Sequence, residues 1–183
     1  MAKLFEVIDD ESFYLKDKEQ MRFIFILGLY TGMRLADCIL LKYSNITKGL
    51  IKCYPKKTIN FDVKVMVPIS NKLINEINKA KKWKSEDIEY LVPLISERYL
   101  RNPDGPKKDI MKIFNKSGIS CKSNEILGFH CLRHTFITEC IKNGMNIHTL
   151  SEITGDNIRT LEKYYIHLRE DTIKKSVSKI PQY

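Results

Sequence analysis

The sequence has no long hydrophobic run and no paired cysteines. Its longest apolar stretch, residues 23–30 (FIFILGLY), is much shorter than the ~18 residues that a membrane-spanning helix needs. The opening segment MAKLFEVIDDES is acidic and lacks the pattern of a signal peptide. The five cysteines are scattered and form no CxxC pair, which argues against a disulfide framework and a zinc ribbon. These features predict a cytoplasmic protein with reduced thiols and no membrane partner.

The composition is that of one globular domain with a surplus of positive charge. The chain has 183 residues, of which 43% are hydrophobic and 29% charged, so it can bury a core. Lysine and arginine number 31 against 22 acidic residues, which gives a formal net charge of +9. Residues 48–122 carry 17 basic and 8 acidic side chains, so the whole surplus lies there. Such a local surplus favours a surface that binds nucleic acid, and ordinary solvated helix faces are the alternative.

Hydrophobic spacing predicts a mostly helical chain with one small sheet. Asp10 or Ser12 is expected to cap the opening helix. Helical spacing and turn signals mark helices at 21–30, 34–41, 71–84, 107–115, 129–142, 147–153 and 160–167. Alternation in residues 50–54 and 63–69 predicts two strands, with the valines of the second strand on one face. A lysine-bearing linker joins them as a hairpin. The predicted fold class is therefore α+β, with a small antiparallel sheet.

The pentapeptide HCLRH is the first candidate for chemistry. His130 and Arg133 are three residues apart and share one face of a helix, and an imidazole beside a guanidinium suits phosphate binding. A helix with an ordinary histidine and a surface arginine is the alternative. His130 and His134 also have metal-ligand spacing, but no HExxH motif and no third ligand cluster accompanies them. We therefore expect no metal.

The segment TGMRLAD is the second candidate. A buried helix ends at the Thr31-Gly32 break, and Arg34 follows at the start of the next helix. Backbone N–H groups and a cation at such a point can bind an anion. Asp37 lies three residues further on and could hold the guanidinium in place. A simple helix corner with a local ion pair is the alternative.

Taken together, the motifs form an ordered set. The order TGMR, lysine hairpin, HCLRH, TGD and YYIH resembles the catalytic domain of the tyrosine recombinase (phage integrase) family. That family places its nucleophilic tyrosine nine residues after the histidine of an LGH motif, and Tyr165 lies nine residues after Asp156. The resemblance covers residues 8–170. Because it rests on separate motifs in the right order, it is more specific than any one of them.

The resemblance implies a role for each matching residue. Arg34 and Arg133 match the two arginines that stabilise the scissile phosphate, and His130 matches the histidine that assists proton movement. Lys57 resembles the hairpin lysine that protonates the leaving 5′ oxygen, and Tyr165 matches the nucleophile.

Other positions match less directly. Asp37 matches an acidic position that supports the first arginine, and Lys56 is the alternative hairpin lysine. Lys56 and Lys64 are expected to contact DNA. Tyr164 is a neighbour that could be mistaken for the nucleophile.

The implied function is site-specific DNA recombination, as in DNA integration by phages and mobile elements. Tyr165 would attack a DNA phosphate, form a 3′-phosphotyrosyl bond and release a 5′-hydroxyl, which needs no metal, ATP or other cofactor. The implied partner is double-stranded DNA, with a homo-oligomer on DNA and a monomer when free. A DNA-binding member of the same fold that has lost efficient cleavage is the alternative function.

The sequence departs from the family pattern in two places. Asp156 stands where the family has a histidine or tryptophan that donates a hydrogen bond to phosphate, and an ionised carboxylate cannot donate. Asn157, one residue further on, or a re-aimed side chain could substitute as the donor; otherwise we expect reduced activity, or an Asp156 side chain that points away. Only 33 residues precede Arg34, so we expect residues 1–183 to form the catalytic domain without the family's N-terminal core-binding domain. Residues 168–183 are expected to form a tail that contacts a neighbouring protomer or packs on its own domain.

Overall fold

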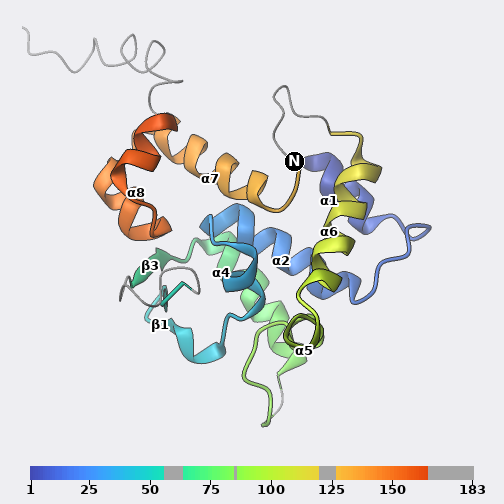
Figure 1. The fold of residues 1–183 in the computed structure, drawn as a ribbon. Helices are drawn as coiled ribbons and strands as arrows, with labels where there is room; N and C mark the ends of the chain where they lie inside the picture. Colours follow the sequence, from blue (N-terminus) through green and yellow to red (C-terminus); the bar gives the residue numbers. More distant parts are fainter. Residues whose placement is uncertain (56–63, 85, 120–126, 165–183) are drawn as a thin grey trace, which may run out of the picture.

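The computed structural model describes residues 1–55, 64–84, 86–119 and 127–164 (Figure 1). The elements are α1 (Ala2–Asp9), α2 (Lys18–Thr31), α3 (Leu35–Ile39), η1 (Tyr43–Asn45), β1 (Ile46–Thr47), β2 (Leu50–Cys53), β3 (Val65–Pro68), α4 (Asn71–Ala80), η3 (Lys81–Trp83), α5 (Pro93–Arg101), α6 (Asp104–Ser117), α7 (His130–Lys142) and α8 (Ile147–Thr154). A further helical segment covers 158–164. The predicted α+β class, mostly helical with a small antiparallel sheet, is confirmed. Within the described ranges, no helix has both the length and the apolar character to cross a membrane.

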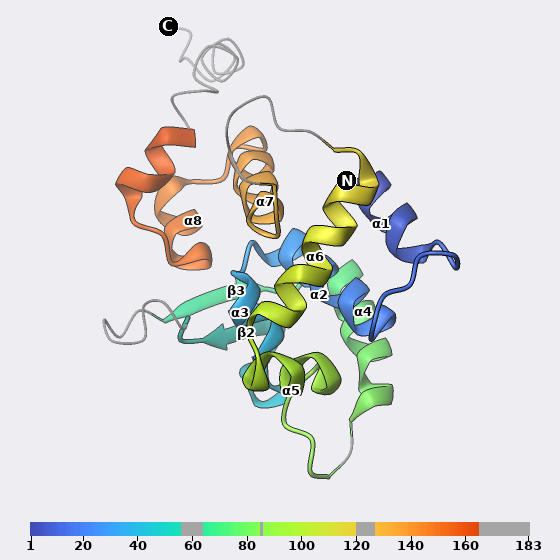
Figure 2. The ribbon, with the colours of Figure 1, turned by 45° about the vertical axis from the view of Figure 1, so that its right-hand side comes forward.

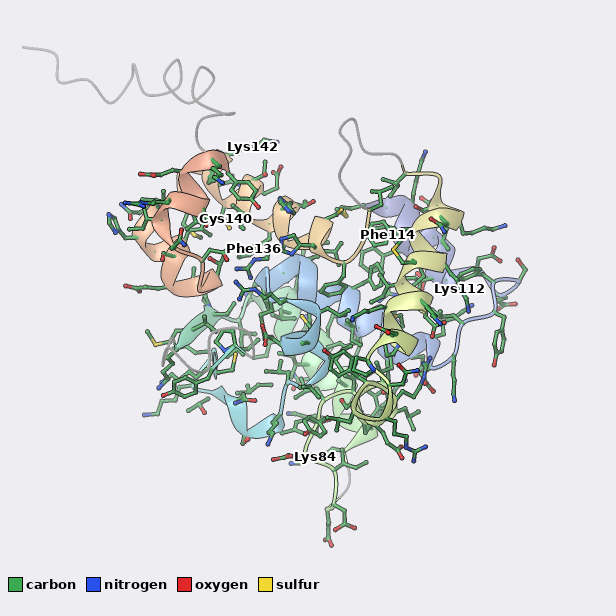
Figure 3. The ribbon with its side chains drawn as sticks, in the orientation of Figure 1. Lys84, Lys112, Phe114, Phe136, Cys140 and Lys142 are labelled. Atoms are coloured by element: carbon green, nitrogen blue, oxygen red, sulfur yellow. The ribbon has the colours of Figure 1, made fainter. Side chains whose placement is uncertain are left out.

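Helix α2 forms the centre of the molecule. It lies between α7 and α8 on one side and α1 and α6 on the other (Figures 1 and 2). Phe25 is fully buried and meets Phe114 of α6 and Phe129 before α7, with ring centroids 6.0 and 5.8 Å apart. Phe114 points from α6 toward α2 (Figure 3). A Cβ at Gly28 would come within 2.5 Å of the Phe129 ring, so the close contact between α2 and α7 requires glycine there.

The sheet is antiparallel and has the order β1-β2-β3, with Ile51 opposite Val67. Val65 and Val67 are buried and Met66 between them is 42% exposed, which confirms the predicted alternation. The predicted strands therefore exist, although β2 and β3 are shorter than expected. The linker between them, 56–63, lies outside the described residues.

The prediction that Asp10 or Ser12 caps the start of the opening helix was wrong. The expected cap residue Asp10 instead ends an earlier helix, α1, and its carboxylate accepts hydrogen bonds from the amide and hydroxyl of Ser12. This local turn competes with a helix start at the same place. Helix α2 begins after Asp17, which has a left-handed backbone (φ 55°).

Helix α5 was not predicted, because its N-terminus depends on a distant side chain. Pro93 occupies the first turn, and the Gln20 side chain of α2 accepts from the amides of Leu94 (3.0 Å) and Ile95 (3.2 Å). Gln20 is 3% exposed. A contact between residues more than 70 positions apart leaves no local sequence signal.

The basic residues of the middle segment are distributed over several elements. Lys84, after η3, and Lys112 of α6 point outward from different parts of the molecule (Figure 3). Several lysines pair with nearby carboxylates on the same helix: Lys79 with Glu76, Lys107 with Asp104, and Lys112 with Asp109. The lysines of α4 and α6 therefore lie on ordinary solvated helix faces and do not form one continuous basic surface.

Candidate active site

The turn between α2 and α3 sets the position of Arg34. Gly32 ends α2 with a left-handed backbone (φ 65°), which glycine adopts without the steric cost of a Cβ. The Thr31 hydroxyl donates to the Leu27 carbonyl and accepts from the Met33 amide at 3.2 Å. Arg34 follows with an extended backbone and precedes α3. The predicted helix break and the placement of an arginine directly after it are therefore both present.

Arg133 of α7 is almost completely buried, with only 2% of its side chain exposed. Its Nη1 donates to the Gly32 carbonyl at the end of α2. Its Nη2 donates to the Thr154 carbonyl at the end of α8, at 2.8 Å. Both carbonyls belong to helix ends, where backbone acceptors have no partner within the helix. Arg133 therefore joins the ends of α2 and α8 to the side of α7.

Asp156 points into the site and bridges the two arginines. Its Oδ1 lies 2.8 Å from Arg34 Nη2, and its Oδ2 lies 2.6 Å from Arg133 Nη2 and 3.2 Å from Arg133 Nε. Gly155 ends α8 with a left-handed backbone (φ 69°), which turns the chain toward the arginines. Of the alternatives for Asp156, a side chain that points away from the site is wrong, because the opposite charge of the arginines attracts it inward.

The backbone of Asp156 is also held in place. Its amide donates to the Thr154 hydroxyl at 3.3 Å, and its carbonyl accepts from the Ser151 hydroxyl at 2.7 Å. The carboxylate is thus presented to the arginines by a fixed segment of chain.

The electrostatics of Arg34 reflect a crowded cationic site. Its side chain is 19% exposed, and its pKa is lowered by burial and by the nearby Arg133 charge. The charges of Asp156 and Asp37 act in the opposite direction, and the supporting role of Asp37 stays a prediction. Arg34 Nη1 is buried and has no hydrogen-bond partner among the described residues. The site therefore offers one more donor than Asp156 satisfies.

His130 is the first residue of α7 and lies at the surface beside the arginines. Its pKa is lowered because the imidazole is partly removed from water and lies near His134 and Arg133, while the Asp156 charge opposes the shift. The His130 and His134 rings are edge to face, with centroids 4.6 Å apart. Among the described residues, no three His, Cys, Asp or Glu side chains form a cluster suited to a metal ion.

Sequence reasoning missed a contact between α7 and the last described helix. The Tyr164 hydroxyl lies 2.7 Å from His134 Nδ1, and Leu161 is fully buried against an apolar cluster from α7 and α8. These contacts hold segment 158–164 on α7. The spacing of His134 and Tyr164, 30 positions apart, gives no sequence signal for their contact.

The structure thus brings together Arg34, His130, Arg133 and Asp156, with Asp37 acting on Arg34. Segment 158–164 runs directly into Tyr165. Tyr165, Lys56 and Lys57 lie outside the described residues, so their roles stay predictions. Lys64 is exposed beside β3, and its contact with DNA also stays a prediction.

This fold, with two arginines and a histidine in one site and a tyrosine later in the sequence, is the arrangement expected of a tyrosine recombinase catalytic domain. The sequence profile of the Phage integrase family matches residues 1–171. The chain belongs to the phage integrase family, and the resemblance seen in its motifs is confirmed.

Individual relatives agree with this assignment. Tyrosine recombinase XerD of Staphylococcus aureus is 23% identical over 150 residues, which cover 79% of this chain and 49% of XerD. The chain therefore spans about half the length of this curated relative.

Solved structures share the fold. The XerH site-specific recombinase in a post-cleavage complex with a palindromic difH substrate has a TM-score of 0.67 and 20% identity, covering 97% of this chain and 51% of that chain. The catalytic domain of bacteriophage HP1 integrase has a TM-score of 0.61 and 22% identity, and the match covers 99% of this chain and 94% of that chain.

Proposed function

We propose that this chain is the catalytic domain of a site-specific DNA recombinase that cleaves DNA through Tyr165. The observation that carries the proposal is the convergence of Arg34, Arg133 and His130 in one site, beside the helical segment that leads into Tyr165. Two guanidiniums at one point suit a phosphodiester, because each can pair with a non-bridging oxygen.

The proposed reaction is a phosphoryl transfer to tyrosine. The Tyr165 oxygen attacks a DNA phosphorus, and a tyrosyl O–P bond forms as the bond from phosphorus to the 5′ oxygen breaks. His130 accepts the phenol proton and Lys57 supplies a proton to the leaving oxygen. Arg34 and Arg133 stabilise the negative charge that builds on the non-bridging oxygens. A second 5′-hydroxyl reverses these steps on another strand, so the bond energy is conserved without ATP.

The lowered pKa of His130 fits its proposed role. A histidine with an ordinary pKa is partly protonated at neutral pH, and a lowered pKa shifts this balance toward the neutral imidazole, which can accept a proton. The same residue is exposed at the surface, where a DNA phosphate can reach it.

The proposed partner is double-stranded DNA, in a homo-oligomer assembled on the recombination site, with the free chain as a monomer. The similarity in fold to XerH, which was solved with its difH substrate, supports a DNA partner. Lys56 and Lys64 would contact DNA phosphates. Residues 1–183 would act as one catalytic domain, and residues 168–183 would contact a neighbouring protomer.

A suicide substrate tests the cleavage proposal. The substrate is a pool of labelled, nicked duplexes with randomised sequence around the nick, from which a short strand is lost after attack so that the covalent adduct accumulates. We expect a labelled protein band under denaturing conditions that disappears in Tyr165→Phe and persists in Tyr164→Phe. An adduct that survives in Tyr165→Phe and is lost in Tyr164→Phe would show that the nucleophile is misassigned.

A DNA-binding member with lost cleavage is the second candidate. The observation that favours it is the Asp156 carboxylate, which already neutralises part of the charge on both arginines. In that case the wild-type protein shifts labelled duplexes in a gel but forms no adduct with any member of the pool. Binding without an adduct would therefore favour this second function.

A further inference from the structure

The two arginines of the site already hold an anion, and that anion is part of the chain. Each oxygen of the Asp156 carboxylate is engaged by a different guanidinium, at 2.8 Å from Arg34 and 2.6 Å from Arg133. A carboxylate and a phosphodiester present a similar pair of oxygens to arginine. Asp156 therefore makes the contacts that two non-bridging phosphate oxygens would make.

The remaining donors show that the carboxylate is an incomplete occupant. Arg133 donates from Nη1 to the Gly32 carbonyl and from Nη2 to the Thr154 carbonyl, so only its edge formed by Nε and Nη2 faces the anion. Arg34 Nη1 is buried and lacks a partner within the described part of the chain. A carboxylate has two oxygens, both of which are used here. A phosphate has more oxygens and can also accept from that nitrogen.

We propose that Asp156 is an internal counter-anion that closes the site in the free protein, and that the scissile phosphate must displace it. This inference rests on the proposed function, because it concerns the regulation of the same site. The Asp156 carboxylate offsets one of the two arginine charges while it is in place, and that charge becomes available to a phosphate when Asp156 leaves. The Asp156 amide donates to the Thr154 hydroxyl and its carbonyl accepts from the Ser151 hydroxyl, so the backbone stays in place and the exchange needs only rotation of the side chain.

The consequence is a threshold for substrate binding. A free anion or a loosely placed DNA phosphate competes with a carboxylate that is always present beside the arginines, so it binds weakly. A phosphate held at the site by many other DNA contacts competes effectively, because its local concentration is high. Asp156 therefore reserves the two arginines for DNA that is already docked.

The test measures binding of inorganic phosphate, which requires neither DNA nor Tyr165. Asp156→Ala removes the carboxylate and leaves space for a phosphate. We expect its dissociation constant for phosphate, measured by calorimetry, to be at least about tenfold lower than that of the wild type, a change of ~1.4 kcal/mol. Sodium chloride at matched ionic strength serves as the reference, because simple screening acts equally in both salts.

Thermal unfolding gives a second readout with a matched control. Asp109→Asn removes another buried carboxylate, which pairs with Arg98 far from the site. Both variants should unfold at lower temperature than the wild type in chloride. Phosphate should raise the unfolding temperature of Asp156→Ala above its value in chloride. The unfolding temperature of Asp109→Asn should be the same in both salts. If Asp156→Ala does not fold in chloride, folding in phosphate supports the inference and failure in both salts overturns it.

The outcomes separate this inference from the proposed function. Equal phosphate affinity in the wild type and Asp156→Ala would overturn the counter-anion role, even if the suicide substrate yields a Tyr165 adduct. Tighter phosphate binding by Asp156→Ala would support it, even if no adduct forms. The isosteric variant Asp156→Asn should also bind phosphate more tightly than the wild type, because it lacks the negative charge.

Discussion

Replacing Arg133 with alanine should lower the stability of the fold, in addition to removing any contribution of this arginine to catalysis. The guanidinium is buried and donates to the carbonyls of Gly32 and Thr154 and to the Asp156 carboxylate. Removing one partner of a buried ion pair typically costs about 3–5 kcal/mol. Arg34 still neutralises Asp156 in the variant, which favours the lower end of this range, whereas the two carbonyls that lose a donor add to the cost. We therefore expect the free energy of unfolding to fall by ~3 kcal/mol.

Urea denaturation followed by circular dichroism measures this loss. With a slope of ~2 kcal/mol per M, the midpoint should fall by about 1.5 M. Arg101→Ala is the control, because Arg101 is 77% exposed and pairs with Glu97 on the helix surface, so its loss should cost under ~0.5 kcal/mol. Arg133→Lys keeps the charge without the planar fork and should lie between the two. A midpoint for Arg133→Ala equal to that of Arg101→Ala would refute the view that this arginine joins the helix ends.

Three further predictions concern other parts of the structure. Gly32→Ala should lower the melting temperature, because φ is 65° and the new Cβ would lie 2.4 Å from the Phe136 ring; Gly49→Ala, also at positive φ but in open space, should lower it less. The lowered pKa of His130 means that the folded state binds fewer protons, so stability should be full above the ordinary pKa of 6.5 and fall as the pH drops below it; His130→Gln should weaken this acid-dependent loss in denaturation curves, and an unchanged loss would contradict the assignment. Gln20→Leu leaves a buried and a partly buried amide at the start of α5 without an acceptor, so chemical denaturation should show that the free energy of unfolding falls by about 1–3 kcal/mol, and no loss would mean that α5 needs no such cap.

The sequence predicted those parts of the site that have a local signature. The glycine break before Arg34 and the HCLRH pentapeptide are contiguous, so their placement on helix ends and faces follows from short-range geometry. Strand β3 could likewise be predicted, because hydrophobic residues alternate with others in its sequence and its residues are buried and exposed in turn.

What the sequence did not predict depends on contacts between distant segments. The direction of the Asp156 side chain is set by Arg34, 122 positions away, and the burial of Arg133 is set by the ends of two other helices. The start of α5 needs Gln20 for the same reason. No window of the sequence contains both partners, so spacing rules cannot find these pairs.

Arg133 also bears on how related sequences should be interpreted. A residue whose only role is to bind substrate can be lost without harm to the fold once the reaction is no longer needed. Arg133 joins α2, α7 and α8, so a descendant without catalytic activity would still lose stability without it. Its presence in a relative is therefore explained by stability alone, and evidence for activity has to come from residues that have no such second role.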